Sequence, residues 1–141
     1  MQIVIRRLKA NHLYTEGVLM VNDQKTIPYS LEHTFTMLPI GEYKVRLIYD
    51  KKRHRVIGIL PKTGTKPLGL LQIGTSYLSI NPATSILVGE QLIPGSTQKG
   101  KEHYNRLYDR IEKCEARKEP ISLIITDAHC QESKVCSHWL R

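Results

Sequence analysis

Only one segment of this chain has the periodicity of a helix. After Pro94-Gly95, apolar side chains recur every three or four residues, which places them on one face of a helix. We expect Ser96 or Thr97 to cap the start of this helix and Pro120 to end it. The face that packs on the rest of the protein should consist of Tyr104, Leu107, Tyr108, Ile111 and Cys114.

The rest of the chain is typical of short β-strands. Apolar and polar residues alternate with a period of two at 27–31 and 43–48, as in half-buried strands. Pro28 marks the first of these as an edge strand or the site of a bulge. We expect a mainly β (β-rich α+β) fold, a meander or partly closed β-sandwich or barrel of roughly eight to ten short strands, with the helix packed on it. The other expected strands lie at 3–8, 16–21, 56–60, 70–73, 77–80, 86–88 and 121–126.

Length and composition predict a single domain. The chain has 141 residues, 40% of them hydrophobic, which is enough to enclose a core without disulfides. We expect one β-rich domain over residues 1–128 and a polar tail over 129–141. The first residues lack the basic, apolar, small order of a signal peptide, and no apolar run is long enough to span a bilayer. These features favour a cytoplasmic protein without a membrane span.

The tail gathers four potential zinc ligands. They are His129, Cys130, Cys136 and His138, and zinc accepts two Cys and two His. Their spacing matches no common zinc finger or knuckle, and an odd total of three cysteines argues against a disulfide framework. We expect a poorly packed tail after Ala128 that binds no metal, and no cofactor elsewhere.

The charge of the chain favours anionic partners. The formal net charge is +8, which attracts nucleic acid, anionic lipid or an acidic polymer. The densest basic cluster contains Lys51, Lys52, Arg53 and Arg55. No aromatic residue is interleaved for base stacking, so a solvated hairpin tip is the better interpretation of this cluster. Nucleic-acid binding through the hairpin is the weaker one.

The segment 76–90 has the frame of a catalytic loop. Two apolar runs flank a turn of small hydroxyl and amide side chains, which predicts a strand, a tight loop and a second strand. Enzymes often place a nucleophile on a loop of this kind. Before Glu90, however, the segment contains no Cys, His, Asp or Lys.

Six motifs, in this order and spacing, carry a resemblance to a known family. They are Gly-Val-Leu-Met-Val-Asn at 17–22, Ser-Leu-Glu-His-Thr at 30–34, Pro-Ile-Gly-Glu-Tyr-Lys-Val-Arg-Leu at 39–47, Ser-Ile-Leu-Val-Gly-Glu at 85–90, Tyr-Asn-Arg-Leu-Tyr at 104–108 and Pro-Ile-Ser-Leu at 120–123. Over about residues 15–126 the chain resembles domain-of-unknown-function family 5675, small proteins of bacteria, phages and mobile elements.

That family has blocks similar to those of L,D-transpeptidases. Typical members carry Ile-Arg-Ile-His before the loop and Gly-Cys-Ile-Leu-Val-Gly after it. In transpeptidases the Cys thiolate attacks a carbonyl of a peptidoglycan stem peptide, with the His lowering the thiol pKa. In this chain Asn81 replaces the His, Ser85 the Cys, Thr84 the Gly and Ser79 the Arg.

The substitutions remove the base and weaken the nucleophile. Asn cannot take a proton, and a Ser hydroxyl without a base attacks poorly near neutral pH. A displaced triad of Ser85, His33 and Glu32 would restore a base. The alternative is that His33 is a polar turn residue and that Glu32 caps or bridges strands.

Two main hypotheses for function follow. The first is a non-catalytic binding protein of phage or mobile-element context, in which a shallow groove holds peptidoglycan or a protein partner. The second is an enzyme acting on cell-wall peptide, transpeptidase-like or hydrolase-like, with Ser85 as nucleophile. We expect Asn81 and Ser85 to lie close together on adjoining strand ends without forming a catalytic pair. The expected groove consists of Ser79, Asn81, Thr84 and Ser85.

Overall fold

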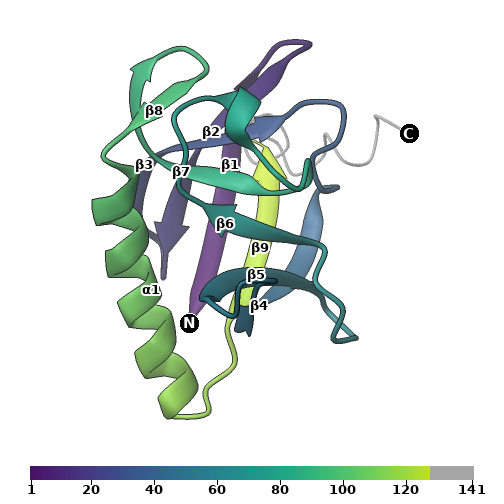
Figure 1. Ribbon diagram of the computed structural model, residues 1–141, viewed down its shortest axis with the longest axis vertical. Helices are drawn as coiled ribbons and strands as arrows, with labels where there is room; N and C mark the ends of the chain where they lie inside the picture. The colour runs from purple at the N-terminus through teal and green to yellow at the C-terminus, as the bar shows by residue number, and fades with distance from the viewer. Residues whose placement is uncertain (128–141) are drawn as a thin grey trace.

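The computed structural model describes residues 1–127. Within them are nine strands, one α-helix and one short 3-10 helix, and eight of the strands form a barrel with the α-helix along its side (Figure 1). The elements in chain order are β1 (Gln2–Ala10), β2 (Tyr14–Val21), β3 (Gln24–His33), β4 (Gly41–Tyr49), β5 (Arg55–Pro61), β6 (Gly69–Gln72), η1 (Tyr77–Ser79), β7 (Ile86–Ile93), β8 (Ser96–Gln98), α1 (Gly100–Ala116) and β9 (Ser122–Asp127).

The sheet closes on itself. The strand order is β3-β2-β1-β9-β4-β5-β6-β7, and β3 pairs with β7 to complete the ring, while β8 lies outside the ring and pairs with β7. Most neighbours are antiparallel, but β1 with β9 and β6 with β7 are parallel. The prediction of a mainly β fold with one α-helix packed on it is confirmed.

The last described strand inserts between the first and the fourth. After α1 the chain returns as β9, where Leu123 lies opposite Ile3 and Ile125 opposite Ile5. These four side chains are fully buried, and apolar residues of the other strands and of α1 pack around them. The barrel interior is therefore a packed core, as closure of a small barrel requires.

The predicted bulge at Pro28 is present. On β2 two steps separate Gly17 from Leu19, whereas their partners on β3, Ser30 and Ile27, are three residues apart. The extra residue on β3 leaves the imino nitrogen of Pro28 outside the regular ladder, where proline can be accommodated. Pro28 does not mark an edge, because β3 pairs on both sides.

The predicted strand at 77–80 is wrong. Residues 77–79 form the 3-10 helix η1, with Ser76 as its N-cap. The Ser76 hydroxyl accepts the N–H of Leu78 (3.2 Å), and the Ser79 hydroxyl donates to the carbonyl of Ser76 (2.7 Å). Local hydrogen bonds from these two serine side chains compete with strand pairing. The apolar residues at 77–80, from which the strand was predicted, give no sign of this competition.

Helix α1 packs its apolar face on the barrel as predicted. Leu107, Ile111 and Cys114 are buried in the core. Tyr104 and Tyr108 are partly buried and pack against the same core, so the predicted inner face is confirmed.

The helix begins later in the chain than expected. Ser96 and Thr97, the expected caps, belong to β8. The backbone N–H of Thr97 donates to the carbonyl of Thr75 (2.9 Å), which holds this segment against the loop before η1. The helix therefore begins at Gly100, after Lys99 takes a left-handed conformation (φ 55°).

The helix also ends before the expected proline. It stops at Ala116, and Pro120 follows only after a turn. Lys118 lies in the left-handed region (φ 57°), and its N–H donates to the carbonyl of Glu115 (2.9 Å). The next N–H along the chain donates to the carbonyl of Cys114 (3.1 Å). These two bonds form a Schellman motif, in which glycine is the usual left-handed residue.

Lys118→Gly should therefore stabilise the protein. Glycine removes the steric cost of a Cβ in the left-handed region, and we expect the free energy of unfolding to rise by about 1 kcal/mol. Lys113→Gly is the matched control, because this exposed lysine lies inside the helix, and there the same change should lower stability by about 1 kcal/mol. Urea denaturation of both variants measures the two signs. Destabilisation of both by the same amount would contradict this account of the helix end.

Candidate functional site

The predicted site residues lie at one end of the barrel, where three loops meet. Thr34 bonds from its backbone N–H to the carbonyl of Leu13 (3.4 Å), which joins the loop after β3 to the loop after β1. The Thr36 hydroxyl donates to the carbonyl of Ala83 (3.0 Å), which joins the loop after β3 to the loop before β7. We call residues 11–13, 34–37 and 77–85 the loop end.

Ser85, the position of the nucleophile in the resembling family, is fully buried. It comes directly before β7, whose parallel pairing with β6 begins at Ile86 opposite Leu71. The Ser85 hydroxyl accepts the backbone N–H of Leu70 (2.9 Å). The side chain thus extends the ladder between β6 and β7 beyond its last backbone pair, and its oxygen is part of the fold.

Two further hydroxyls of the expected groove also stabilise the loop. The Thr84 hydroxyl donates to the carbonyl of Leu68, and that of Ser79 bonds within the η1 turn. Asn81 is exposed, and the side-chain amide of Gln72 bonds its backbone: Oε1 accepts from the N–H of Asn81 (3.2 Å) and Nε2 donates to its carbonyl. We had expected Asn81 at a strand end, but it follows the 3-10 helix η1 instead. Gln72 was missed, because a Gln at the end of a strand gives no signal in the sequence.

Glu32 is occupied by a buried ion pair. Its side chain is 1% exposed, and its two carboxylate oxygens accept from Nε (2.9 Å) and Nη2 (2.8 Å) of Arg7. Nη2 also donates to the carbonyl of Leu38 (2.6 Å). Because β1 and β3 are separated by β2 in the sheet, this pair crosses the interior near the loop end. This is the strand-bridging role, one of the two interpretations open from the sequence.

His33 packs among aromatic rings. Its imidazole meets the ring of Tyr77 edge-on (centroids 6.1 Å apart, 89°), and Tyr77 also lies against Tyr14 (5.1 Å). Among the contacts of the described residues, no hydrogen bond joins its ring to Ser85 or Glu32. The structure therefore does not connect the three members of the displaced triad, since Glu32 bonds Arg7 and Ser85 bonds the backbone.

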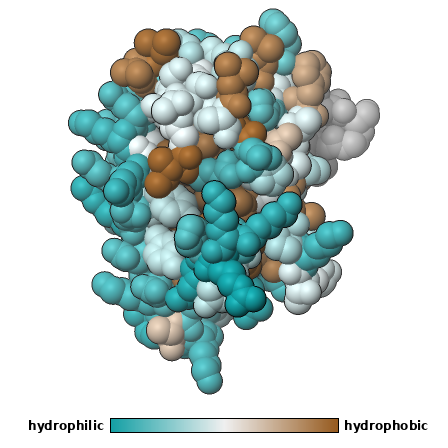
Figure 2. Space-filling model, in the orientation of Figure 1, coloured by the Kyte–Doolittle hydropathy of each residue, from teal (hydrophilic) through white to brown (hydrophobic). Residues whose placement is uncertain are grey.

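The loop end exposes apolar side chains. Phe35 is 84% exposed, Leu78 76% and Leu13 46%, and the partly exposed rings of Tyr77 and Tyr14 lie among them. Figure 2 shows apolar side chains over the upper part of the molecule, where η1 and the hairpin of β7 and β8 lie, and mainly hydrophilic ones below. Large apolar side chains that gather on a surface are typical of contact with another molecule.

A second buried polar cluster anchors the hairpin of β7 and β8. The Tyr29 hydroxyl donates to the Glu16 carboxylate and accepts the N–H of Gly95 (3.0 Å). Gln91 donates to the same carboxylate (3.0 Å). Burial, reinforced by the Glu16 contact, raises the pKa of Tyr29 well above its usual value. Because the Tyr29 hydroxyl and one oxygen of the Glu16 carboxylate are both bonded within the fold, we assign this cluster a structural role.

The basic hairpin tip is partly neutralised. Arg55 reaches α1 and lies 3.3 Å from the carboxylate of Glu112 and 3.9 Å from that of Glu115. Lys51, Lys52 and Arg53 are exposed at the turn. The hairpin tip is therefore exposed to solvent, and Arg55 alone of these four basic residues forms ion pairs with the helix among the described contacts.

Within residues 1–127 no group of three or more His, Cys, Asp or Glu side chains could hold a metal ion. The potential ligands His129, Cys130, Cys136 and His138 lie outside the described residues, as does the expected tail. No helix in the described part of the chain is long and apolar enough to cross a membrane.

The chain matches no protein-family model, no curated protein and no solved structure. Its resemblance to domain-of-unknown-function family 5675 stays a prediction that the six motifs carry.

The buried hydroxyl of Ser85 should matter for stability. Ser85→Ala leaves the N–H of Leu70 without its acceptor, and we expect the free energy of unfolding to fall by about 1–3 kcal/mol. Asn81→Ala is the control in the same loop, because its exposed side chain makes no hydrogen bond among the described residues, and it should change stability by less than about 0.5 kcal/mol. Urea denaturation compares the two. Equal effects would show that the Ser85 hydroxyl does not support the ladder.

Glu32→Leu should be strongly destabilising. It leaves the guanidinium of Arg7 buried without its counter-ion, which costs about 3–5 kcal/mol. Adding Arg7→Met removes the unpaired charge and should recover most of the loss. Chemical denaturation of the two single variants and the double variant measures the coupling. If the losses simply add, the two side chains do not act as a pair.

Proposed function

We propose that this protein is a non-catalytic binding protein that holds its partner at the loop end. The observation that carries the proposal is the fully buried hydroxyl of Ser85, which accepts the N–H of Leu70. A nucleophile must reach its substrate and must lie beside a base. Ser85 meets neither condition, because its oxygen is enclosed and bonded to the backbone.

The binding part of the proposal is supported by the surface that the loop end presents. Phe35 and Leu78 expose most of their apolar side chains, and the side-chain amide of Asn81 is available beside η1. Bonds within the fold hold the loops that carry them, so little ordering is needed when a partner binds. Apolar groups around a neutral amide suit a peptide or a peptide-bearing polymer.

The partner that we propose is peptidoglycan or a protein. The stem peptides of peptidoglycan offer amides and apolar side chains, and their carboxylates would be attracted by the net charge of +8. The phage or mobile-element context is part of the same proposal and rests on the resemblance alone.

The alternative is an enzyme acting on cell-wall peptide, with Ser85 as nucleophile. It would require the loop before β7 to open and expose the hydroxyl. It would also require Glu32 to leave Arg7, with which it forms a bidentate pair. The binding proposal needs neither rearrangement.

Purified cell-wall sacculi should retain the protein without being altered. We expect binding in a pull-down, and no cleaved or exchanged stem peptides when the muropeptides are analysed by mass spectrometry. New muropeptides, or an adduct of an acyl-type serine probe on Ser85, would establish the enzyme.

Binding should depend on the loop end. Phe35→Ser and Leu78→Ser should each weaken retention, because they remove apolar contact area. Tyr49→Ser is the matched control, since Tyr49 is 70% exposed but lies at the other end of β4, away from the loop end. If all three variants bind sacculi equally, the contact lies elsewhere. If none of the proteins is retained, the same variants are compared in cross-linking to protein partners.

A further inference from the structure

We propose that one flank of helix α1 binds the phosphate backbone of a nucleic-acid duplex. The flank carries a line of basic side chains: three of them recur every three or four residues within the helix, which places them on a single stripe, and one more lies at each cap. We call this line the α1 basic stripe. It consists of Lys99, Arg106, Arg110, Lys113 and Arg117.

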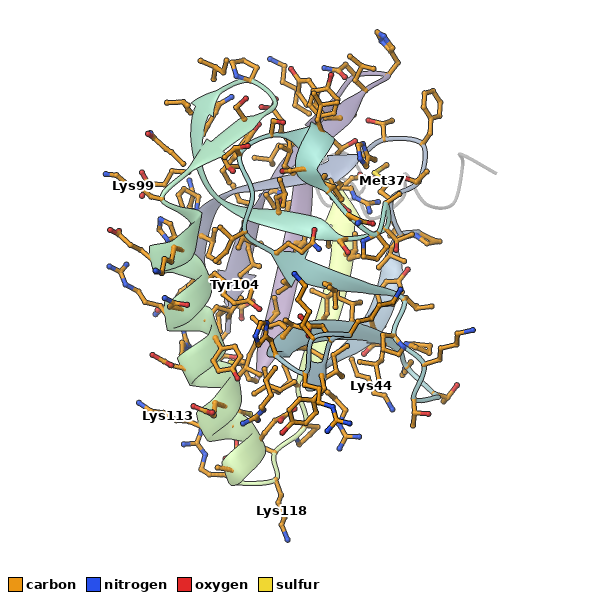
Figure 3. All side chains as sticks on the ribbon, in the orientation of Figure 1. Met37, Lys44, Lys99, Tyr104, Lys113 and Lys118 are labelled. Carbon is orange, nitrogen blue, oxygen red and sulfur yellow. The ribbon has the colours of Figure 1, made fainter. Side chains whose placement is uncertain are left out.

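The stripe is long, straight and exposed. From Arg106 to Arg117 it extends about 16 Å at the helical rise of 1.5 Å per residue. Its side chains are exposed to solvent. Figure 3 shows Lys99 and Lys113 on the same side of α1, both directed away from the barrel. Because α1 is packed on the core through Leu107 and Ile111, the spacing of the cations is fixed by the fold.

The cations of the stripe are largely free of counter-ions. Within the described residues, Arg117 alone among them forms an ion pair, with Glu119 (2.7 Å). Glu90, near the start of the helix, is bonded to His103 (2.8 Å). That hydrogen bond is the main cause that lowers the pKa of Glu90, and the positive charges of Lys99 and Arg106 act in the same direction.

The acidic residues of α1 lie on other faces. Glu112 and Glu115 face the β4–β5 hairpin, where both approach Arg55. Helical geometry places Glu102 and Asp109 between this flank and the stripe, on the side most distant from the core. The helix therefore separates two basic surfaces, the α1 basic stripe and the hairpin tip, with acidic side chains between them.

A recess adjoins the stripe at its C-terminal half. Its volume is about 330 Å³, and its basic lining consists of Arg110, Lys113 and Arg117. Asn22, in the turn between β2 and β3, adds an amide to the same recess. Glu119 also lines the recess and neutralises Arg117 (2.7 Å), which leaves Arg110 and Lys113 as the cations without an ion pair among the described contacts. Two such cations and an amide beside a hollow suit a phosphate group, which accepts hydrogen bonds on all of its free oxygens.

The geometry favours a duplex over a single strand. Recognition of single strands depends on aromatic side chains on which bases stack. The tyrosines of α1 lie on its other flank, where the Tyr104 hydroxyl accepts the N–H of Ile57 in β5 (3.3 Å) and Tyr108 packs beside it (6.3 Å). Over about 16 Å a duplex presents roughly ten phosphate charges, enough to face every cation of the stripe.

A membrane surface is the less suitable partner. Helices that lie on membranes bury Trp, Phe or Leu beside their basic residues. The side chains on the two sides of the stripe are instead the packed core and the acidic residues Glu102 and Asp109. In a duplex, contacts with the phosphate backbone do not reach the base edges, so binding by the α1 basic stripe should be independent of the base sequence.

The test is a titration of a fluorescein-labelled 20-base-pair DNA duplex, followed by fluorescence anisotropy from 50 to 200 mM salt. We expect micromolar binding at low salt and a slope of log K against log salt of about −3 to −4, because each neutralised phosphate contributes about −0.9. Arg110→Gln with Lys113→Gln should weaken binding at least tenfold at 50 mM salt and reduce the slope by about 2.

The matched control removes the same charge from the hairpin tip. Lys51→Gln with Lys52→Gln lowers the net charge equally and should change affinity by less than threefold. The four positions are exposed, so the variants should fold, which circular dichroism and thermal unfolding verify. Equal losses in the two double variants would show that net charge alone drives binding, and a larger loss in the hairpin variant would place the contact there.

Further outcomes decide between partners. Absence of duplex binding at 50 mM salt would overturn the proposal, as would tighter binding to a labelled 20-nucleotide single strand. Stronger binding to vesicles of phosphatidylserine and phosphatidylcholine, lost in the Arg110 and Lys113 variant, would assign the stripe to a membrane.

The loop-end variants Phe35→Ser and Leu78→Ser should bind the duplex normally, because the stripe shares no residue with the loop end. Failure of one proposal therefore leaves the other intact.

Discussion

The pairing of β3 with β7 is the constraint on which the rest of the structure depends. Three residue pairs, centred on Ser30 opposite Val88, convert an open sheet into a barrel with an enclosed core. On its other side β7 lies against β8 and the start of α1, where Gly89 has no room for a side chain: a Cβ would lie 2.8 Å from the carbonyl oxygen of Gln98 and 3.2 Å from the Cα of Gly100. The same closure places the ends of β3 and the start of β7 together and so creates the loop end.

At the loop end, side chains satisfy backbone groups that strands would otherwise leave unpaired. Ser85 takes the N–H beyond the last pair of β6 and β7, and Gln72 bonds both backbone groups of Asn81. A backbone group that loses its partner costs free energy, so the Ser85 hydroxyl and the Gln72 amide stabilise the folded loop. A frame that resembles a catalytic loop can therefore be maintained by structural demands alone. What this leaves for function is the exposed apolar and amide surface above it.

Exposed basic side chains and exposed apolar side chains lie on different parts of the surface. The loop end carries exposed apolar side chains, whereas exposed basic residues gather on α1 and at the tip of the β4–β5 hairpin. On α1 the core, the hairpin contacts and the stripe each take one face of the helix. Glu112 and Glu115 lie on the hairpin face, where they approach Arg55, and Glu102 and Asp109 border the stripe, in which Arg117 alone among the described contacts forms an ion pair. Folding thus separates charges that are intermixed along the sequence.

The sequence by itself determined the features that depend on local periodicity. The alternation at 27–31 and the spacing from Tyr104 to Cys114 predicted strands and a buried helix face, and Pro28 predicted a bulge. The end of the helix was misplaced, because a lysine in the left-handed region carries none of the signal that a glycine gives. The 3-10 helix η1 was predicted as a strand and the strand β8 was missed, since side-chain and long-range hydrogen bonds there override the local pattern.

The candidate site was decided by the tertiary structure. The sequence identified the loop at 76–90 as unusual and gave its residue types, but the role of a hydroxyl depends on what lies opposite it. Only the parallel pairing of β6 with β7 gives Ser85 the N–H of Leu70, and only the pairing of β1 and β3 on either side of β2 brings Arg7 to Glu32. Such contacts join residues 15 and 25 positions apart, and no local pattern records them. The physical reason is that hydrogen bonding and burial depend on neighbours in space, whereas periodicity reports neighbours in the chain.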